Sequence, residues 1–365
     1  MAAALNSQQI MVREEVAPDP YASSWLDRLT ASVDRLPGPA WLVYLLTGVL
    51  VLLLFTVLKW VDGTFPVGHV ELYHLVFVGT PLYALAVLHL LDQVAGQALE
   101  DFRPVLITDA ATVARLRYQL TTLPATPALV VTLGCVVSAF LVWWNVGDVQ
   151  EALAARPWAF LPITALEAAI TLSTWVLAGL FIYHTVHQLR TVTAIYAEHT
   201  RINLFTLGPL YTFSRLTALT AIAPMPLFLV DYLGWPGQGN EPITTGTLGL
   251  WGLFGLLSVC TFVLPLLGVR RLLAQERAQA QLDLAARLRT LLAGLHQQVS
   301  SGAASADSTT ATKNLLDSLL AEQGLLNKVS SWPWAPETPR ALATALLLPV
   351  LVVIISELVK RLFGL

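Results

Sequence analysis

The sequence has few charged residues for a chain of 365 residues. Aspartate, glutamate, lysine and arginine make up only 12% of it, about half the share found in ordinary soluble domains. Hydrophobic residues make up 55%. A soluble fold of this size needs more charge to cover its surface, so the composition excludes an ordinary soluble domain. The formal net charge of −3 argues against a nucleic-acid partner.

The sequence also lacks the residue patterns of common enzyme and metal sites. It has only two cysteines, Cys135 and Cys260, and both lie in apolar runs, which predicts buried free thiols. It has no glycine-rich phosphate loop and no serine elbow. His184 and His187 lack the glutamate of the zinc-protease motif, which favours a structural role for them. We therefore expect no enzyme activity, no catalytic or metal-binding residues and no cofactor.

Seven long apolar runs stand out against this background. A helix of about 20 such residues crosses the roughly 30 Å hydrocarbon core of a bilayer. In the first run, Trp41 and Trp60 are about 28 Å apart along a helix, a spacing that suits the two interfaces. The sequence thus predicts an all-α, multi-pass membrane protein with spans at about 41–60, 74–93, 127–146, 158–183, 208–232, 245–269 and 341–359.

Positive charge predicts the orientation of these spans. With a cytoplasmic N-terminus and an extracytoplasmic C-terminus, almost all of the 21 lysines and arginines lie in cytoplasmic segments. The exceptions are Lys59, Arg156, Lys360 and Arg361. This asymmetry is typical of proteins inserted in the cell membrane. The preference for arginine over lysine also favours a prokaryotic source.

The spans and the segments between them divide the chain into four parts. These are a cytoplasmic N-terminal segment, a six-helix bundle with cytoplasmic extensions, anchor helices with a linker, and a final span, at 1–40, 41–269, 270–340 and 341–365. Within the first part, residues 22–36 predict an amphipathic helix at the inner membrane surface. Ser24 and Asp27 have the spacing of a capping box at its start.

The connections expected on the cytoplasmic side are long and helical. Residues 109–122 predict a short helix, the fourth span is expected to continue to Ile195, and the sixth to about Val299. A linker at 300–312 and a second amphipathic helix follow. The apolar stripes of these helices must be covered, either within one subunit or by copies of the chain; packing between copies is the favoured interpretation.

A charged residue within a membrane span is costly and often functional. Glu167 lies about 13 Å inside the fourth span, and its sequence neighbours offer no partner. Two interpretations stay open: a carboxylate of a ligand pocket or ion path, or a protonated acid bonded to a neighbouring helix. Asp92, at a span end, is expected to be an ordinary boundary residue.

The final span has the pattern of a pore helix as well as that of a packing helix. A symmetric ring of such helices would place apolar rings at mid-depth, which gate by dewetting, and a carboxylate ring at the outer end, which favours cations. The pore-lining candidates are Leu348, Val352, Ile355, Ser356 and Glu357. In the alternative, Glu357 pairs with Arg361 one turn further on.

This layout resembles the seven-transmembrane ion channel superfamily that includes the insect odorant and gustatory receptors. The resemblance covers nearly all of the chain after residue 40 and rests on topology. The insect members carry Thr-Tyr, five apolar residues and Gln-Phe in the last helix, whereas here Thr344 is followed by Ala345 and no Gln-Phe follows. The resemblance implies a homotetramer joined through the anchor helices, with a chemoreceptor-like ligand pocket in the outer half of each bundle. Its candidate residues are Tyr83, Trp143, Glu167 and Trp251.

The leading hypothesis from the sequence is therefore a homotetrameric, cation-conducting channel, gated by a small ligand or open constitutively. The alternatives are a small-solute transporter that uses Glu167, and a membrane scaffold or sensor whose cytoplasmic helices recruit a partner. Ion conductance separates the first from the second, and partner binding without any flux would mark the third.

Overall fold

The computed structural model describes residues 19–61, 63, 65–146, 161–200, 208–227, 245–300, 306–328, 334 and 337–363. Every regular element in these residues is a helix, apart from two isolated β-bridges. The helices are α1 (Trp25–Asp34), α2 (Ala40–Val61), α3 (Leu72–Phe102), η1 (Arg103–Val105), α4 (Ala110–Thr121), α5 (Ala125–Val146), α7 (Leu161–Glu198), η3 (Gly208–Tyr211), α8 (Thr212–Ile222), α10 (Thr245–Ser300), α11 (Ala306–Lys328) and α12 (Glu337–Phe363). The all-α prediction is confirmed for this part of the chain.

Five of the described helices are long and apolar enough to cross a membrane. They lie at Ala40–Val61, Leu72–Val105, Ala125–Trp143, Pro162–Glu198 and Ser258–Gln297. These five match the first, second, third, fourth and sixth expected spans. The expected fifth span is described only as far as α8 and the short segment after it, and residues 228–232 lie outside the described residues. The five helices make the chain a membrane-embedded protein.

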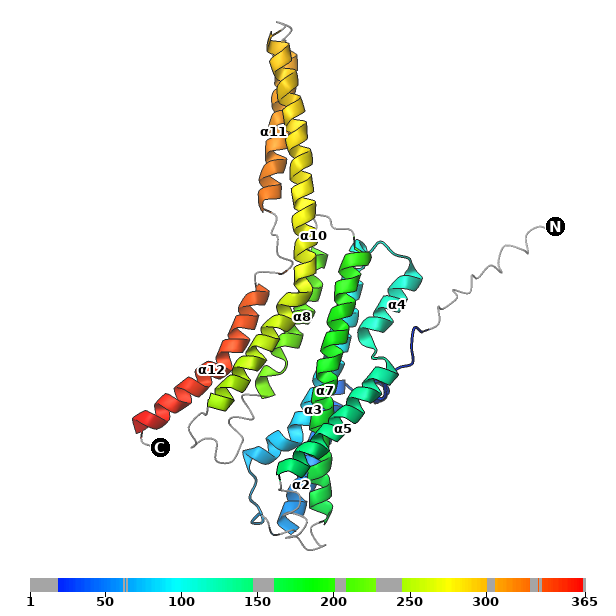
Figure 1. Ribbon diagram of the computed structural model, residues 1–365, viewed down its shortest axis with the longest axis vertical. Helices are drawn as coiled ribbons and strands as arrows, with labels where there is room; N and C mark the ends of the chain where they lie inside the picture. The colour runs from blue at the N-terminus through cyan, green and yellow to red at the C-terminus, as the bar shows by residue number, and fades with distance from the viewer. Residues whose placement is uncertain are drawn as a thin grey trace, which may run out of the picture.

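The long helices α2, α3, α5 and α7 run in alternating directions, and the second half of α10 projects far from the rest together with α11 (Figure 1). The second half of α10 and the whole of α11 form an antiparallel hairpin, here called the projecting hairpin (residues 270–328). At about 1.5 Å per residue, the 56 residues of α10 measure about 84 Å. This length exceeds the roughly 30 Å hydrocarbon core several-fold, so much of α10 lies outside it.

A continuous apolar core joins α3, α4, α7, α8 and α10 near the base of the projecting hairpin. At its centre the rings of Phe102, Tyr196 and Phe213 contact one another, with centroids 5.1 to 5.5 Å apart. All three side chains are buried. A second core cluster holds α1, α2, α3, α5 and α7 together. The same cores position the polar groups described below.

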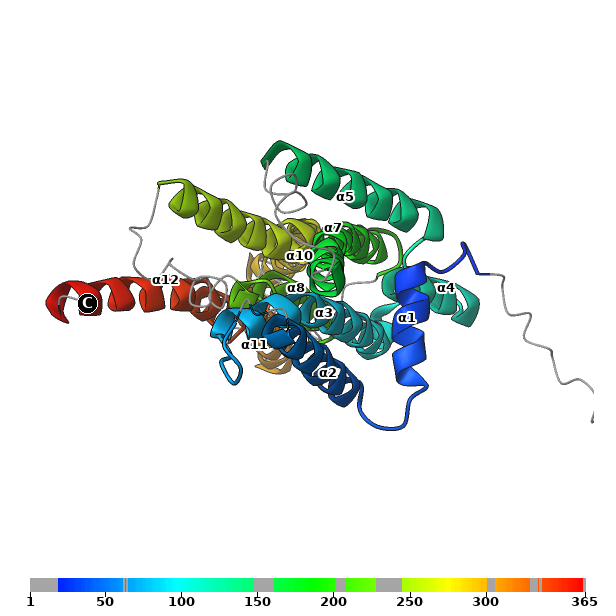
Figure 2. The same ribbon diagram turned by 90° about the horizontal axis from the view of Figure 1, so that it is seen from below.

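Helix α1 begins where the sequence predicts, because Ser24 and Asp27 form the expected capping box. Figure 2, which looks along the long axis, shows α1 side-on whereas α7 is seen nearly end-on. Helix α1 therefore lies across the bundle axis. Its start is attached to the segment before α5, because the backbone N–H of Ser24 donates to the carbonyl of Leu123 and that of Ala125 donates to the carbonyl of Ala22.

The other helices expected outside the spans are also present. Helix α4 has Asp109 as its N-cap and buries Leu116 and Leu120, α7 is unbroken past Ile195, and α10 reaches Ser300. The expected linker is too long, because α11 already begins at Ala306. The serines, alanines and threonines of this stretch suggested a flexible segment. Alanine, however, is the strongest helix former, and it favours the earlier start of α11.

Candidate functional site

Among the described side chains of the expected pore helix, those packed on the bundle lie in its first turns. Leu342 of α12 is buried in a small apolar cluster with α8 and α10, and Leu346 is packed against it. Further along, Leu348 and Ile355 are 52% and 58% exposed, and Val352 is half-buried. The side chains of Ser356 and Glu357 lie outside the description. The pore assignment of all five residues stays a prediction.

The expected ligand-pocket residues take separate partners. The Tyr83 hydroxyl donates to the carbonyl of Ala223, at 2.7 Å, and thereby joins α3 to the end of α8. Glu167 faces α2 instead, and Trp143 is half-buried at the far end of α5. The side chain of Trp251 lies outside the description. Their role in binding a ligand stays a prediction.

Glu167 has a partner that the sequence did not reveal. Its Oε1 atom lies 2.5 Å from Nζ of Lys59 on α2, and the two side chains are 28% and 10% exposed. The ammonium also lies 5.6 Å from the centroid of the Phe55 ring. The sequence neighbours of Glu167 offered no partner, and the structure supplies one from a helix that lies more than 100 residues earlier. Each charge lowers the cost of burying the other.

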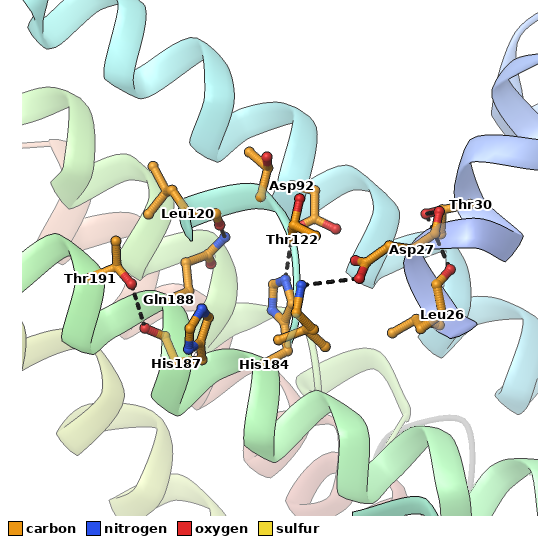
Figure 3. Close-up of polar contacts among 12 residues, drawn as sticks. Leu26, Asp27, Thr30, Asp92, Leu120, Thr122, His184, His187, Gln188 and Thr191 are labelled. Carbon is orange, nitrogen blue, oxygen red and sulfur yellow. Dashed lines mark hydrogen bonds and ion pairs between the residues drawn. The ribbon is translucent and has the colours of Figure 1, made fainter. Parts of the chain in front are cut away.

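The main cluster of polar side chains lies where α1, α3, α4 and α7 meet, here called the histidine–carboxylate cluster (Tyr21, Asp27, Asp34, His89, Asp92, His184, His187 and Gln188). Figure 3 shows its α7 part: His184, His187 and Gln188 point from one helix toward α3 and the end of α4. Nε2 of His184 lies 2.7 Å from Oδ1 of Asp92. His184 is 3% exposed, so its imidazole is shielded from solvent, whereas Asp92 is partly exposed.

A second carboxylate–imidazole pair lies one turn earlier on α3. Nε2 of His89 lies 3.1 Å from Oδ1 of Asp34, the last residue of α1. The other ring nitrogen, Nδ1, lies 2.9 Å from the Tyr44 hydroxyl of α2. His89 is 4% exposed. Because His89 and Asp92 are three residues apart on α3, the two pairs lie on the same side of that helix.

Three further contacts bind the end of α4, two from α7 and one from Tyr21, which precedes α1. Nε2 of His187 lies 2.9 Å from the carbonyl of Gln119, and the Gln188 amide donates to the carbonyl of Leu120. The Tyr21 hydroxyl donates to the carbonyl of Thr122 at 2.8 Å. Carbonyls near the C-terminus of a helix have no partner within it. The histidine–carboxylate cluster thus satisfies the last carbonyls of α4.

Asp27 links the start of α1 to the segment before α5. Its Oδ2 accepts hydrogen bonds from the N–H and hydroxyl of Ser24 and from the N–H of Leu123. Burial raises the pKa of Asp27 above its ordinary value, while the hydrogen bonds from Ser24 oppose this and the negative charge of Asp92 adds to it. Burial also raises the pKa of the nearby phenol of Tyr21.

A polar cleft of about 960 Å³ opens beside this cluster, between α1, α3 and α4. Its walls carry charges of both signs, including Arg28, Arg35, Asp92 and Glu100. Two buried polar atoms near the cleft have no hydrogen-bond partner among the described residues: Nδ1 of His184 and Oε1 of Gln188. A buried polar group normally finds a partner, so each of these atoms is a place where a water molecule can bind.

The cluster joins α1, α3 and α7 to the end of α4 through imidazole, carboxylate, phenol and amide groups. No group of three or more histidine, cysteine or acidic side chains in the described residues could hold a metal ion. The expectation that Asp92 is an ordinary boundary residue was incomplete. Its spacing from His89 on one face of α3 was the available signal.

Comparisons with known proteins identify no similar protein. No protein-family model, no curated protein and no solved structure matches this chain.

Proposed function

We propose that the chain is the subunit of a homotetrameric, cation-conducting channel in the cell membrane. Each subunit would contribute seven spans, with its N-terminus in the cytoplasm, and α12 would line a central pore. A small ligand bound in the outer half of the bundle would gate it. The observations that carry the proposal are the exposed apolar side chains of the projecting hairpin and of α12.

The projecting hairpin exposes leucines where lipid cannot cover them. Leu282 on α10 is 71% exposed, and Leu315 and Leu325 on α11 are each 55% exposed. At about 25 cal/mol per Å² of apolar surface, covering such side chains is favourable. This part of α10 extends beyond the length that a bilayer can cover, so protein is the available covering. A second copy of the hairpin has the matching surface in a symmetric assembly.

Helix α12 supports the same arrangement. It stands at the edge of the bundle (Figures 1 and 2), and beyond its packed first turns it exposes Leu347, Leu348, Leu351 and Ile355. Around a shared axis, the helices of four subunits would present apolar rings to the pore, with Glu357 near the outer mouth. Apolar constrictions gate by dewetting, and a carboxylate ring favours cations.

The test is the mass and symmetry of the purified particle, followed by ion flux in liposomes. We expect a four-fold particle whose cation flux loses selectivity over anions in Glu357→Gln. Arg361→Gln is the control for the alternative in which Glu357 only pairs with Arg361: equal effects of the two substitutions on thermal stability, with unchanged selectivity, would support the packing role. A monomer would remove the central pore and refute the proposal.

The projecting hairpin also favours a second candidate, a scaffold or sensor that recruits a cytoplasmic helical partner to the exposed leucines. In that case the particle is monomeric and shows no flux, and Leu282→Glu abolishes partner binding while the helical content of the protein is unchanged.

A further inference from the structure

An apolar crevice lies beside α1 on the membrane-embedded part of the bundle. It has a volume of about 540 Å³ and is lined by α1, α2, α3, α5 and α7. Its lining includes Trp25 and Leu29 of α1, Pro81 and Leu82 of α3, and Ala169 of α7. The lining belongs to four of the five helices that are apolar enough to span a membrane, together with α1.

The few polar groups of the wall are already bonded within the protein. The indole N–H of Trp25 donates to Oγ1 of Thr132, at 3.0 Å. The Thr132 hydroxyl donates to the carbonyl of Ala128, and the Ser173 hydroxyl donates to that of Ala169. An occupant therefore finds no free side-chain donor among the described residues that line the crevice. A hydrocarbon chain meets this requirement, whereas a polar ligand would lose its bonds to water.

Arg28 of α1 and Arg35, the residue after its end, line the polar cleft that adjoins this helix. Arg28 is adjacent to Trp25 on the helix surface, at a spacing of three, and Arg35 lies two turns further, about 10.5 Å along the axis. Both are exposed, and in the described part of the chain neither guanidinium has an ion-pair partner. Nearby Asp34 and Asp27 are bonded to His89 and Ser24.

We propose that this crevice binds one acyl chain of an anionic phospholipid, whose phosphate contacts Arg28 and Arg35. The apolar wall takes the chain, Trp25 lies at the level where chain and headgroup join, and the arginines lie beyond it. Two guanidinium groups two turns apart suit a phospholipid headgroup better than the single carboxylate of a fatty acid. The inference requires only that the bundle lies in a membrane with α1 at its surface, and is independent of channel activity.

The experiment is a lipid titration of the purified full-length protein followed by native mass spectrometry. Phosphatidylglycerol, phosphatidylcholine and palmitate are compared as probes. We expect one tightly bound phosphatidylglycerol per subunit. Arg28→Gln and Arg35→Gln should each weaken it roughly fivefold, the effect of one basic residue at an anionic lipid. Ala169→Phe, which fills the crevice, should weaken it at least as much.

Two matched controls separate the site from general effects. Arg115→Gln removes an exposed arginine of α4 that does not line the crevice or the cleft, and Ala165→Phe adds a ring one turn earlier on α7; both should bind phosphatidylglycerol like the wild type. Ser173→Phe, at another lining position, replaces Ala169→Phe if that variant loses its helical content.

Each contrary result overturns a stated part of the proposal. Equal binding of phosphatidylcholine refutes the role of the arginines, and tighter binding of palmitate refutes the phospholipid. If the arginine variants weaken binding while Ala169→Phe and Ser173→Phe do not, the headgroup binds α1 without a chain in the crevice, and the site as proposed is wrong.

Discussion

Nζ of Lys59 and Oε1 of Glu167 lie 2.5 Å apart, across the contact between α2 and α7. Both residues lie in helices that are apolar enough to span a membrane. An ionisable side chain at such a position is expensive unless it is paired. The pair gives Glu167 a structural role that is compatible with a further role in ligand binding.

Replacing one partner of this ion pair should destabilise the fold more than replacing both partners. Lys59→Met leaves the carboxylate without its cation and should destabilise the fold by roughly 2 kcal/mol, less than the roughly 3–5 kcal/mol of fully buried pairs because Glu167 is 28% exposed. The double variant Lys59→Met/Glu167→Leu should recover most of this loss. Thermal unfolding in detergent measures both, and an additive loss in the double variant would contradict the prediction.

The contact between α5 and α7 depends on glycine at position 179. A Cβ atom placed there would overlap Sγ of Cys135. We therefore expect Gly179→Ala to destabilise the protein by about 1–3 kcal/mol, the usual cost of overpacking. Adding Cys135→Ala should restore stability, since the nearest remaining atoms are at ordinary contact distance. Gly134→Ala, on α5, is the matched control, because nothing lies within 4 Å of the position that its added methyl group would take.

The Asp92–His184 pair should contribute to stability through a hydrogen bond that water cannot replace. Asp92→Leu removes the partner of His184 Nε2, in a ring whose Nδ1 is already unpartnered among the described residues. A buried polar group left without a partner costs about 1–3 kcal/mol. Asp101→Leu, at an exposed position on the same helix, should have little effect. Equal unfolding temperatures for the two variants would refute this role of Asp92.

Asp27 should make stability depend on pH in a defined direction. Its pKa is raised in the folded protein, mainly by burial, so the folded state holds this proton at pH values where the unfolded state has lost it. Stability from this group therefore falls as the pH rises from the ordinary value of 3.8 through the raised one. Asp27→Asn loses that dependence.

The measurement is the difference in unfolding temperature between wild type and Asp27→Asn across this pH range. At low pH, Asp27→Asn should unfold at a lower temperature than the wild type, and this difference is its deficit. The reason is that an amide replaces the carboxylate that accepts hydrogen bonds from Ser24 and Leu123. The deficit should shrink as the pH rises through the raised pKa. A deficit that grows with pH would show that the hydrogen bonds to the charged form outweigh burial.

Features set by neighbouring residues could be predicted from the sequence, and those set by distant ones could not. The capping box of Ser24 and Asp27 lies within one helical turn, and the extension of α7 past Ile195 follows from an unbroken helical pattern. Lys59 with Glu167, and Asp92 with His184, join helices that are far apart in the sequence. Residue spacing contains no information on which helices become neighbours, so these partners required the structure.

Helix α10 joins the membrane-embedded bundle to the projecting hairpin without a break (Figure 1). Its part beyond residue 270 is about 45 Å long. It therefore acts as a lever arm: a tilt of about 10° at the bundle would carry its tip through about 8 Å, by simple geometry on that length. Small rearrangements among apolar side chains would thus become displacements large enough to be followed by spectroscopic labels at the hairpin tip.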